Sequence, residues 1–312
     1  LEGFEVLVAS DASTDSTESI VDEESDYTVV RSEQRLGKEH AQKLAVDQAK
    51  GEVLVFSDVA TLLDPDAIRN IAANFADPSV GCVSSEDRFI DERGHVSGEG
   101  AYVKYEMMLR RLETKVCSLV GLSGSFFAAR EEVCADWAVD LQSDFNTLLN
   151  AVKKGYRGIL DPSSLGYYRN ISDENKEFNR KVRTVLRGLA VLMRNLDVLN
   201  VLKYRVFAWE IFSHKLCRWL VPFFLVLALI SNIFLVFESS VYVLLLVAQL
   251  AFYALAVWHY TGWPRLKRKS EGYLQPLARL KSLLSLPYFF MVVNAAIISA
   301  WIKYLKGERS VY

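Results

Sequence analysis

The chain has 312 residues and a formal net charge of −2, and 51% of its residues are hydrophobic. This length predicts about two domains, and the near-zero charge argues against nucleic-acid binding, which usually needs a strongly basic face. The four cysteines are far apart and include no Cys-x-x-Cys pair. Their spacing argues against a disulfide framework or a zinc site and favours a reducing, cytosolic location for the water-facing part.

The N-terminal region alternates strands and helices, which predicts a doubly wound, mostly parallel α/β sheet. Strands are expected at residues 4–9, 27–31, 52–56 and 80–84, with helices at 17–24, 38–50 and 64–75. Asp11 and Asp58 each come directly after a strand. Ligands of such sheets bind beyond the carboxyl ends of the strands, so one ligand can meet both aspartates. Because a strand follows Leu1 at once, we expect the first strand of the sheet to be missing from this chain.

The pattern is less regular between this region and the apolar C-terminal part. We expect a hairpin at residues 88–96, helices at 102–117 and 145–154, and a short strand at 125–129. A long basic amphipathic stretch follows at residues 177–200, with Val182, Leu189 and Leu192 among the apolar residues of one side. Because it directly precedes the first long apolar run, we expect a helix that lies in the membrane interface.

The chain ends with three apolar runs of about 20 residues, the length that a helix needs to cross the hydrocarbon of a bilayer. These runs are residues 216–237, 241–260 and 283–302. We therefore expect a water-facing domain over residues 1–205 and a membrane domain with about three transmembrane helices over residues 206–312.

A basic cluster at residues 265–269 lies between the second and third apolar runs. The positive-inside rule makes this loop cytosolic. It predicts a multi-pass protein of the inner or plasma membrane whose water-facing domain lies in the cytosol. The third run contains Pro287 and Asn294, so a kinked or partly interfacial path stays open beside a full crossing.

Two features of the water-facing domain are typical of sites for a phosphorylated ligand. Aspartates at strand ends, such as Asp11 and Asp58, often hold a ribose hydroxyl or a divalent cation on a diphosphate. Gly37-Lys38 opens a helix, and helix N-terminal amides with a nearby ammonium attract phosphate. The sequence has no Walker loop and no Gly-x-Gly-x-x-Gly after a strand, which argues against ATPase and dinucleotide-binding functions. Each feature alone is also compatible with a plain capped loop.

Taken in order, these features resemble the motifs of the family-2 glycosyltransferases. The resemblance is to the processive, membrane-anchored group that includes hyaluronan, chitin-oligosaccharide and cellulose synthases. Residues 10–17 are similar to the family's Asp-Gly-Ser-x-Asp-x-Thr turn, and Gly37-Lys38 to the start of its diphosphate-side helix. Residues 56–61 stand in the place of its metal-binding Asp-x-Asp.

The resemblance continues in the middle of the chain, so that it covers six ordered segments. Residues 121–130 are similar to the family's Gly-x-x-Gly stretch, which lies under the acceptor sugar. Ser143-Asp144-Phe145 stands where the family has its catalytic base, before a helix that ends in Gly155-Tyr156-Arg157. The resemblance implies a GT-A-like sheet followed by C-terminal transmembrane helices.

The resemblance also implies roles for single residues on the donor side. Asp11 would contact the base or ribose of the nucleotide, with Asp15 as a second candidate, and Lys38 would help to bind the diphosphate. Asp58 would sit beside the sugar nucleotide and its divalent cation, Mg or Mn. Ala60 replaces the family's second acid, which leaves this metal to Asp58, water and the diphosphate itself.

On the acceptor side, Gly124 and Ser125 would lie under the acceptor sugar, and Asp144 would be the general base. The family's Gln-x-x-Arg-Trp motif is not found as such, and residues 177–184 are taken in its place. Arg180 or Arg183 is then expected near the diphosphate. The alternative for these two arginines is a basic interfacial helix that contacts lipid phosphates.

The function implied by the resemblance is inverting transfer of a sugar from a nucleotide-diphosphate sugar, expected to be a UDP-sugar, at the cytosolic membrane face. The acceptor would be a growing polysaccharide or a lipid-linked sugar, and polysaccharide-export subunits are candidate partners. Two alternatives stay open. One is a polyprenyl-phosphate glycosyltransferase that makes a single lipid-linked sugar, and the other is a catalytically dead assembly subunit that binds sugar nucleotides.

Overall fold

The computed structural model describes residues 3–23, 26–90, 101–169, 174–267 and 277–308. The chain forms two compact units. The first unit contains Leu1–Ser172 and Arg187–Lys215, and the second contains Asp173–Leu186 and Leu216–Glu308. The boundary predicted between the water-facing and membrane domains, at residue 205, stays a prediction.

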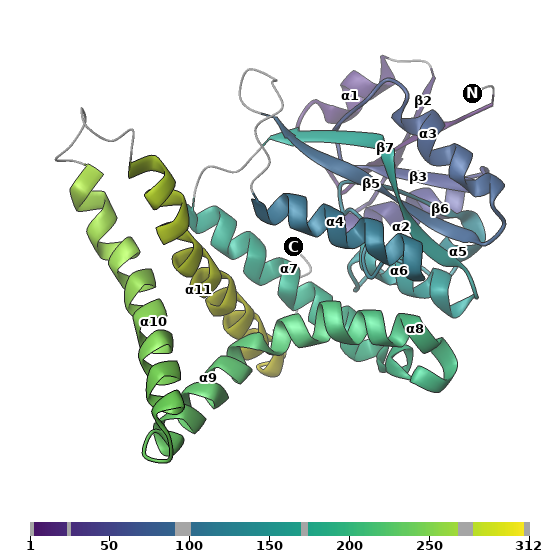
Figure 1. Ribbon diagram of the computed structural model, residues 1–312. Coiled ribbons are helices and arrows are strands. Elements are labelled where there is room, and N and C mark those ends of the chain that lie inside the picture. Colours follow the sequence, from purple (N-terminus) through teal and green to yellow (C-terminus); the bar gives the residue numbers. More distant parts are fainter. Residues whose placement is uncertain (1–2, 24–25, 91–100, 170–173, 268–276, 309–312) are drawn as a thin grey trace. The chain divides into compact units, whose positions relative to one another are not determined.

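The described strands of the first unit form two sheets (Figure 1). In the small sheet, β1 (Val6–Ser10) pairs in parallel with β2 (Tyr27–Arg31). The large sheet has five strands in the order β3-β6-β5-β7-β4. Its strands are β3 (Val53–Ser57), β4 (Leu62–Leu63), β5 (Val80–Ile90), β6 (Phe126–Arg130) and β7 (Arg157–Arg169).

The large sheet is mixed, so the expectation of a mostly parallel sheet is wrong for it. Only the β5–β7 pair is parallel among the described pairs of this sheet, whereas β3–β6, β5–β6 and β4–β7 are antiparallel. Alternating strands and helices predict parallel neighbours because a helix normally carries the chain back before the next strand. β6 instead enters between β3 and β5 running opposite to both, a placement that its own sequence does not encode.

The helices of the first unit begin close to the expected residues. The helices predicted at 38–50, 102–117 and 145–154 are found within a few residues of those limits. The helix predicted at 64–75 is shorter and ends in a 3₁₀ turn, Asn74–Ala76. The bounds are α1 (Thr17–Asp22), α2 (Lys38–Gln48), α3 (Ala67–Ala73), α4 (Ala101–Val116), α5 (Glu131–Cys134) and α6 (Ser143–Lys153). The predicted hairpin at 88–96 falls largely outside the described residues.

The core lies on both faces of the large sheet, and β6 contributes side chains to both faces. Phe126 and Phe127 are neighbours on β6, and both are almost fully buried. Since successive side chains of a strand point to opposite faces, Phe126 packs with Ile71 of α3, and Phe127 packs with Leu148 of α6. The sheet is therefore covered on both sides, and β6 is packed on both of its faces.

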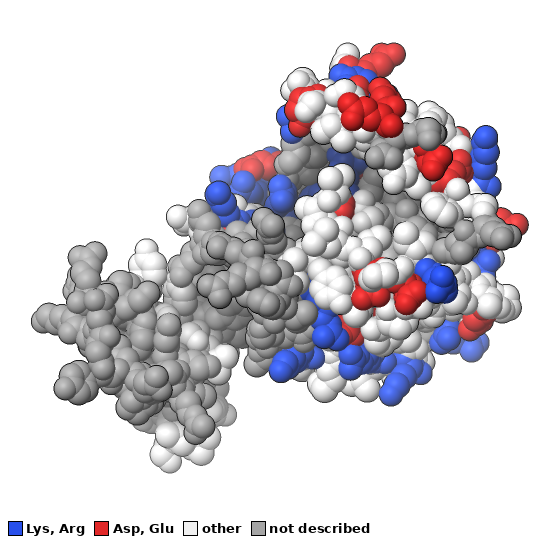
Figure 2. Space-filling view, turned by 90° about the horizontal axis from the view of Figure 1, so that it is seen from above, with Lys and Arg blue, Asp and Glu red and all other residues white. Residues whose placement is uncertain are grey.

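The chain leaves the sheet through α7 (Glu174–Arg194), a 3₁₀ turn (Leu196–Leu199), α8 (Val201–Ile211) and a π-helical turn (Phe212–Leu216). The second half of α7 belongs to the first unit, where Leu189 and Leu192 are fully buried. The membrane-interface position predicted for residues 177–200 stays a prediction. On the face drawn in Figure 2, basic and acidic side chains occur together, as expected from the near-zero net charge.

The second unit contains three long helices, α9 (Cys217–Leu235), α10 (Ser240–Lys267) and α11 (Leu277–Leu305). Polar contacts join them, among them a hydrogen bond from Trp301 Nε1 to the Trp219 carbonyl at 2.9 Å. In the part of the chain that the structure describes, three helical stretches are long and apolar enough to cross a membrane. They are Val201–Leu235, Ser240–Thr261 and Ser285–Leu305, which confirms the three predicted apolar spans but not their orientation.

Candidate active site

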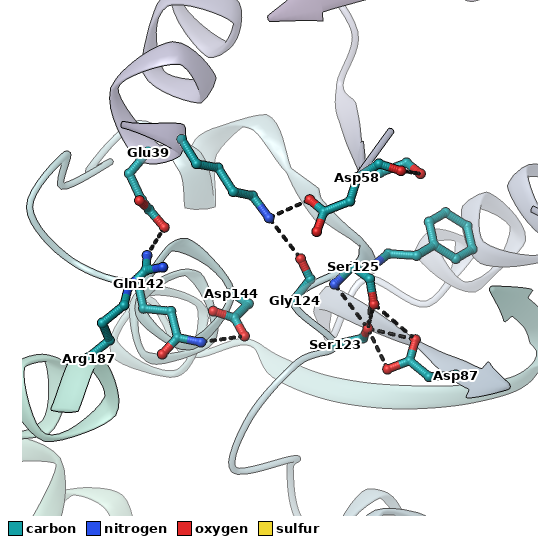
Figure 3. A network of polar contacts seen from close by, with 12 residues as sticks. Glu39, Asp58, Asp87, Ser123, Gly124, Ser125, Gln142, Asp144 and Arg187 are labelled. Carbon is teal, nitrogen blue, oxygen red and sulfur yellow. Dashed lines mark hydrogen bonds and ion pairs between the residues drawn. The ribbon is translucent and has the colours of Figure 1, made fainter. Parts of the chain in front are cut away.

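The ammonium of Lys38 joins two of the predicted segments. Lys38 is the first residue of α2, and its Nζ lies 2.5 Å from Asp58 Oδ1 and donates to the Gly124 carbonyl at 3.0 Å. In Figure 3 the dashed lines from Asp58 and Gly124 meet at this ammonium. Both charged side chains stay about 40% exposed, so the pair lies at the surface, where a ligand can reach it.

The local backbone explains why Asp58 faces this point. β3 ends at Ser57, and the next amide, that of Asp58, donates to the Ser125 carbonyl at 2.8 Å, which continues the β3–β6 pairing by one bond. The amide of Thr61 then donates to the Asp58 carbonyl at 2.9 Å and closes a turn. The carboxylate of Asp58 is therefore fixed beside residues 124 and 125 of the loop that precedes β6.

Asp11 lies at the end of β1 and contacts the chain just before α2. Its Oδ1 accepts hydrogen bonds from the amides of Leu36 at 2.9 Å and Gly37 at 3.0 Å. Gly37 has a φ of +100°, a conformation that favours glycine. Asp11 thus holds the turn from which Lys38 extends, and the strand-end position predicted for it is observed.

Asp144 is in the first turn of α6 and is only 7% exposed. Gln142 Nε2 donates to its Oδ2 at 3.1 Å, and a Cβ added at Gly124 would lie 3.3 Å from the same oxygen. Figure 3 shows Asp144 and Gln142 on one side of Gly124 and Asp58 on the other. The structure therefore brings Lys38, Asp58 and Asp144 to the same loop.

Burial raises the pKa of Asp144 above the ordinary value of an aspartate. The charge of Lys215, a backbone hydrogen bond from Phe145, and the charges of Lys38 and Arg187 oppose this rise. A carboxylate in such surroundings is a better proton acceptor near neutral pH than an exposed one, and a strongly perturbed acid is typical of functional sites.

Asp87 is a functional candidate that sequence reasoning missed. It lies on β5 beneath the loop, and both of its oxygens accept from Ser123 Oγ at 2.7 Å. Ser85 Oγ donates to it at 3.1 Å, and Ser125 Oγ lies at the limit of a hydrogen bond, 3.5 Å. Burial raises the pKa of Asp87, and Arg110 opposes the rise. A run of polar residues inside a buried strand was the available signal, because such groups need partners.

Arg187 and Lys215 were also missed. Arg187 of α7 pairs with Glu39 of α2, which is almost fully buried. Lys215, in the π-helical turn, holds its Nζ 4.3 Å from the centroid of the Phe145 ring. A Cβ added at Gly121 would come within 2.9 Å of this nitrogen. Both cations thus lie beside elements that carry Asp144 or its neighbouring loop.

The family's Gln-x-x-Arg-Trp motif was sought at Arg180 and Arg183, which belong to the second unit. Arg180 donates to Glu177 of its own helix at 2.7 and 2.8 Å. A role for these two arginines at the diphosphate stays a prediction.

The residues around Asp58 do not form the donor set that a divalent cation needs. Mg²⁺ and Mn²⁺ are usually held by several oxygen ligands. Over the described ranges, no three His, Cys, Asp or Glu side chains are placed to hold a metal ion together. Asp58 is ion-paired with Lys38, and Ala60 offers no side-chain oxygen.

Comparisons with known proteins point to glycosyltransferases. Residues 1–137 match the family model "Glycosyl transferase family 2". The chain is 24% identical over 217 residues to poly-beta-1,6-N-acetyl-D-glucosamine synthase of Staphylococcus aureus strains COL and MSSA476, an alignment that covers 66% of this chain. It spans about half, 52%, of the length of these relatives.

A solved structure shows the same fold. The mannosyltransferase PcManGT from Pyrobaculum calidifontis, in complex with GDP-Man and Mn2+, superposes with a TM-score of 0.63 over 97% of this chain and 78% of that one. The two sequences are 21% identical, so the likeness concerns the fold alone. The chain has an α/β GT-A-like fold with a mixed sheet, followed by long apolar C-terminal helices.

Proposed function

We infer that this chain, which carries a glycosyl transferase family 2 domain, is a membrane enzyme that transfers a sugar from a nucleotide-diphosphate sugar to a growing polysaccharide. The observation that carries the inference is the meeting of Lys38, Asp58 and Asp144 at Gly124. A cation for the diphosphate, an acid at a strand end and a buried base are the groups that this reaction requires.

The reaction that we propose is a direct displacement with inversion at the anomeric carbon. The acceptor hydroxyl attacks this carbon while Asp144 takes the hydroxyl proton. The new C–O bond forms as the bond to the diphosphate breaks, and the nucleoside diphosphate leaves with the electron pair. A positioned carboxylate base contributes roughly 10²–10⁴-fold to such a rate. Asp144 suits this role because burial raises its pKa while nearby cations keep the ionised form accessible.

Lys38 would draw the departing diphosphate away from the sugar, since its ammonium already binds a carboxylate and a carbonyl at the surface. Gly124 and Ser125 would form the floor under the acceptor, because a side chain at 124 would meet Asp144. Asp11 would act on the nucleotide side, where it holds the turn before Lys38.

Likeness to the polysaccharide synthase favours a growing polymer as acceptor. A UDP-sugar is the donor that we expect, and the basic cluster at residues 265–269 favours reaction at the cytosolic face. A polyprenyl-phosphate acceptor is the second candidate, supported by the apolar helices that would bring the chain beside lipid. Polysaccharide-export subunits are the partners that a growing polymer would require.

The test is release of nucleoside diphosphate by the purified full-length protein in lipid nanodiscs, supplied with a panel of nucleotide sugars. A polymer acceptor predicts a ladder of saccharide products, whereas a polyprenyl phosphate predicts one product that extracts into organic solvent. Asp144→Asn should abolish release. Asp140→Asn is the matched control, because Asp140 is an exposed neighbour that pairs with Arg194. Absence of release with every nucleotide sugar would favour the assembly-subunit alternative.

A further inference from the structure

We propose that Lys38, Lys215 and Arg187 bind the diphosphate of the donor in this protein, in the place of a divalent cation held by carboxylates. The proposal rests on the function proposed above and goes further, because it names the groups that neutralise the leaving group. It follows from the few oxygen ligands that side chains around Asp58 can offer a metal ion and from the positions of the three cations.

The available carboxylates are already occupied by other partners. Asp58 accepts from Lys38 at 2.5 Å, so a metal ion on this oxygen would meet an ammonium at close range. Asp87 accepts from Ser123 with both oxygens and is buried. Asp144 accepts from Gln142 and is needed as the base. Ala60, where the family has its second acid, supplies no ligand.

Three cations from separate elements face this region instead. Lys38 starts α2, Arg187 lies in the second half of α7, and Lys215 lies in the π-helical turn. Lys38 donates to the Gly124 carbonyl, the Lys215 ammonium lies beside the Phe145 ring, and Arg187 pairs with Glu39, the residue after Lys38. The charges of all three also lower the pKa of Asp144. π-Helical turns are rare and frequently occur at functional sites, and this one brings Lys215 within 4.3 Å of the ring next to Asp144.

The charges around Asp58 also favour side-chain cations. Ala60 brings no negative charge next to Asp58, and Lys38 pairs with Asp58. Little uncompensated negative charge is therefore left there to attract a divalent cation. Of the three side-chain cations, Arg187 adds less, because Glu39 already neutralises it.

The experiment measures binding of UDP, GDP and inorganic pyrophosphate to the full-length protein in nanodiscs, by calorimetry, with EDTA or with Mn²⁺. We expect the wild type to bind its nucleoside diphosphate equally well in both conditions. Lys215→Gln should weaken binding about tenfold or more in EDTA, because a charge-assisted hydrogen bond to the diphosphate is lost. Lys154→Gln is the matched control, since Lys154 pairs with Asp136 on the surface.

A second variant tests the missing acid directly. Ala60→Asp combined with Lys215→Gln adds a carboxylate next to Asp58 and removes one of the cations, and we expect its UDP binding to depend on Mn²⁺, with roughly tenfold stronger binding when the metal is added. Two results would overturn the proposal. In the first, EDTA weakens binding to the wild type about tenfold and Mn²⁺ restores it; in the second, the Lys215→Gln variant binds the nucleoside diphosphate as tightly as the wild type. Absence of any nucleoside diphosphate binding in both conditions would instead refute the proposed function.

Discussion

The two sheets of the first unit hold their candidate site residues in different ways. The small β1–β2 sheet is partly exposed, with Tyr27 46% accessible, and it presents Asp11 to backbone amides of a surface turn. The large sheet buries Phe126 and Phe127 almost completely, and the loop before β6 rests on side-chain hydrogen bonds to Asp87. The small sheet, called the exposed side below, positions its site residue through local turns. The large sheet with the loop before β6, called the buried side below, positions its site residues through packing between distant segments.

This difference predicts where substitutions matter most. Changes on the buried side should alter chemistry or stability strongly, because the polar groups there have no water to replace a lost partner. Changes on the exposed side should be weaker, because solvent can satisfy the groups that are left behind.

The largest effect is expected for Asp144→Asn, which should lower turnover by roughly 10²–10⁴-fold. In the wild type, turnover should fall as the pH falls through the raised pKa of Asp144, because the base must be ionised. Rates of nucleoside diphosphate release between pH 4 and 8 would measure both effects. A mutant that turns over normally would remove Asp144 from the mechanism.

The same variant should be more stable than the wild type at neutral pH. Because burial raises the folded-state pKa of Asp144, the folded protein holds its proton more tightly than the unfolded chain does. Ionisation therefore costs stability above that pKa, and this cost disappears as the pH falls below it. Thermal melts of both proteins at pH 7 and at acidic pH should show a gap that narrows on acidification.

Gly158→Ala should destabilise the buried side by about 1–3 kcal/mol. A Cβ at this position would lie 2.4 Å from Leu148 Cδ1 and 3.0 Å from Cys82 Sγ, so the core must shift. Gly51→Ala is the control, since its nearest contact would be the Val53 carbonyl at 3.4 Å. Equal melting temperatures for the two variants would show that the core next to β7 accepts an added methyl group without loss of stability.

Asp11→Ala should have a smaller effect, about tenfold on donor affinity, because the amides of Leu36 and Gly37 lose a charged acceptor. Asp11→Asn separates two explanations. If Asp11 only holds the turn, the amide oxygen of Asn should restore much of the affinity. If the carboxylate contacts the nucleotide, Asn and Ala should be equally weak in calorimetric titrations.

Arg31→Gln should have the smallest effect, below about 1 kcal/mol, because exposed ion pairs contribute little. Arg31 of β2 pairs with Glu18 of α1 and donates to the Ser13 carbonyl at 3.1 Å. Chemical denaturation would measure the change, and adding salt to the wild type should reproduce most of it. A loss above 2 kcal/mol would contradict the view that this sheet is weakly coupled.

The sequence by itself determined the features that depend on neighbouring residues. Strand and helix positions, the three apolar spans and the strand-end aspartates at 11 and 58 follow from periodicity and strand ends, which are local properties, whereas Asp144 was indicated only by the resemblance to the family. The helix that begins at Lys38 was predicted for the same reason.

Tertiary structure alone decided the direction of β6, the burial of Asp87 and the approach of Arg187 and Lys215 to the region of Asp144. These features depend on contacts between residues far apart in the chain. Such contacts are chosen by the packing of the whole core, and periodicity within a single segment carries no information about them.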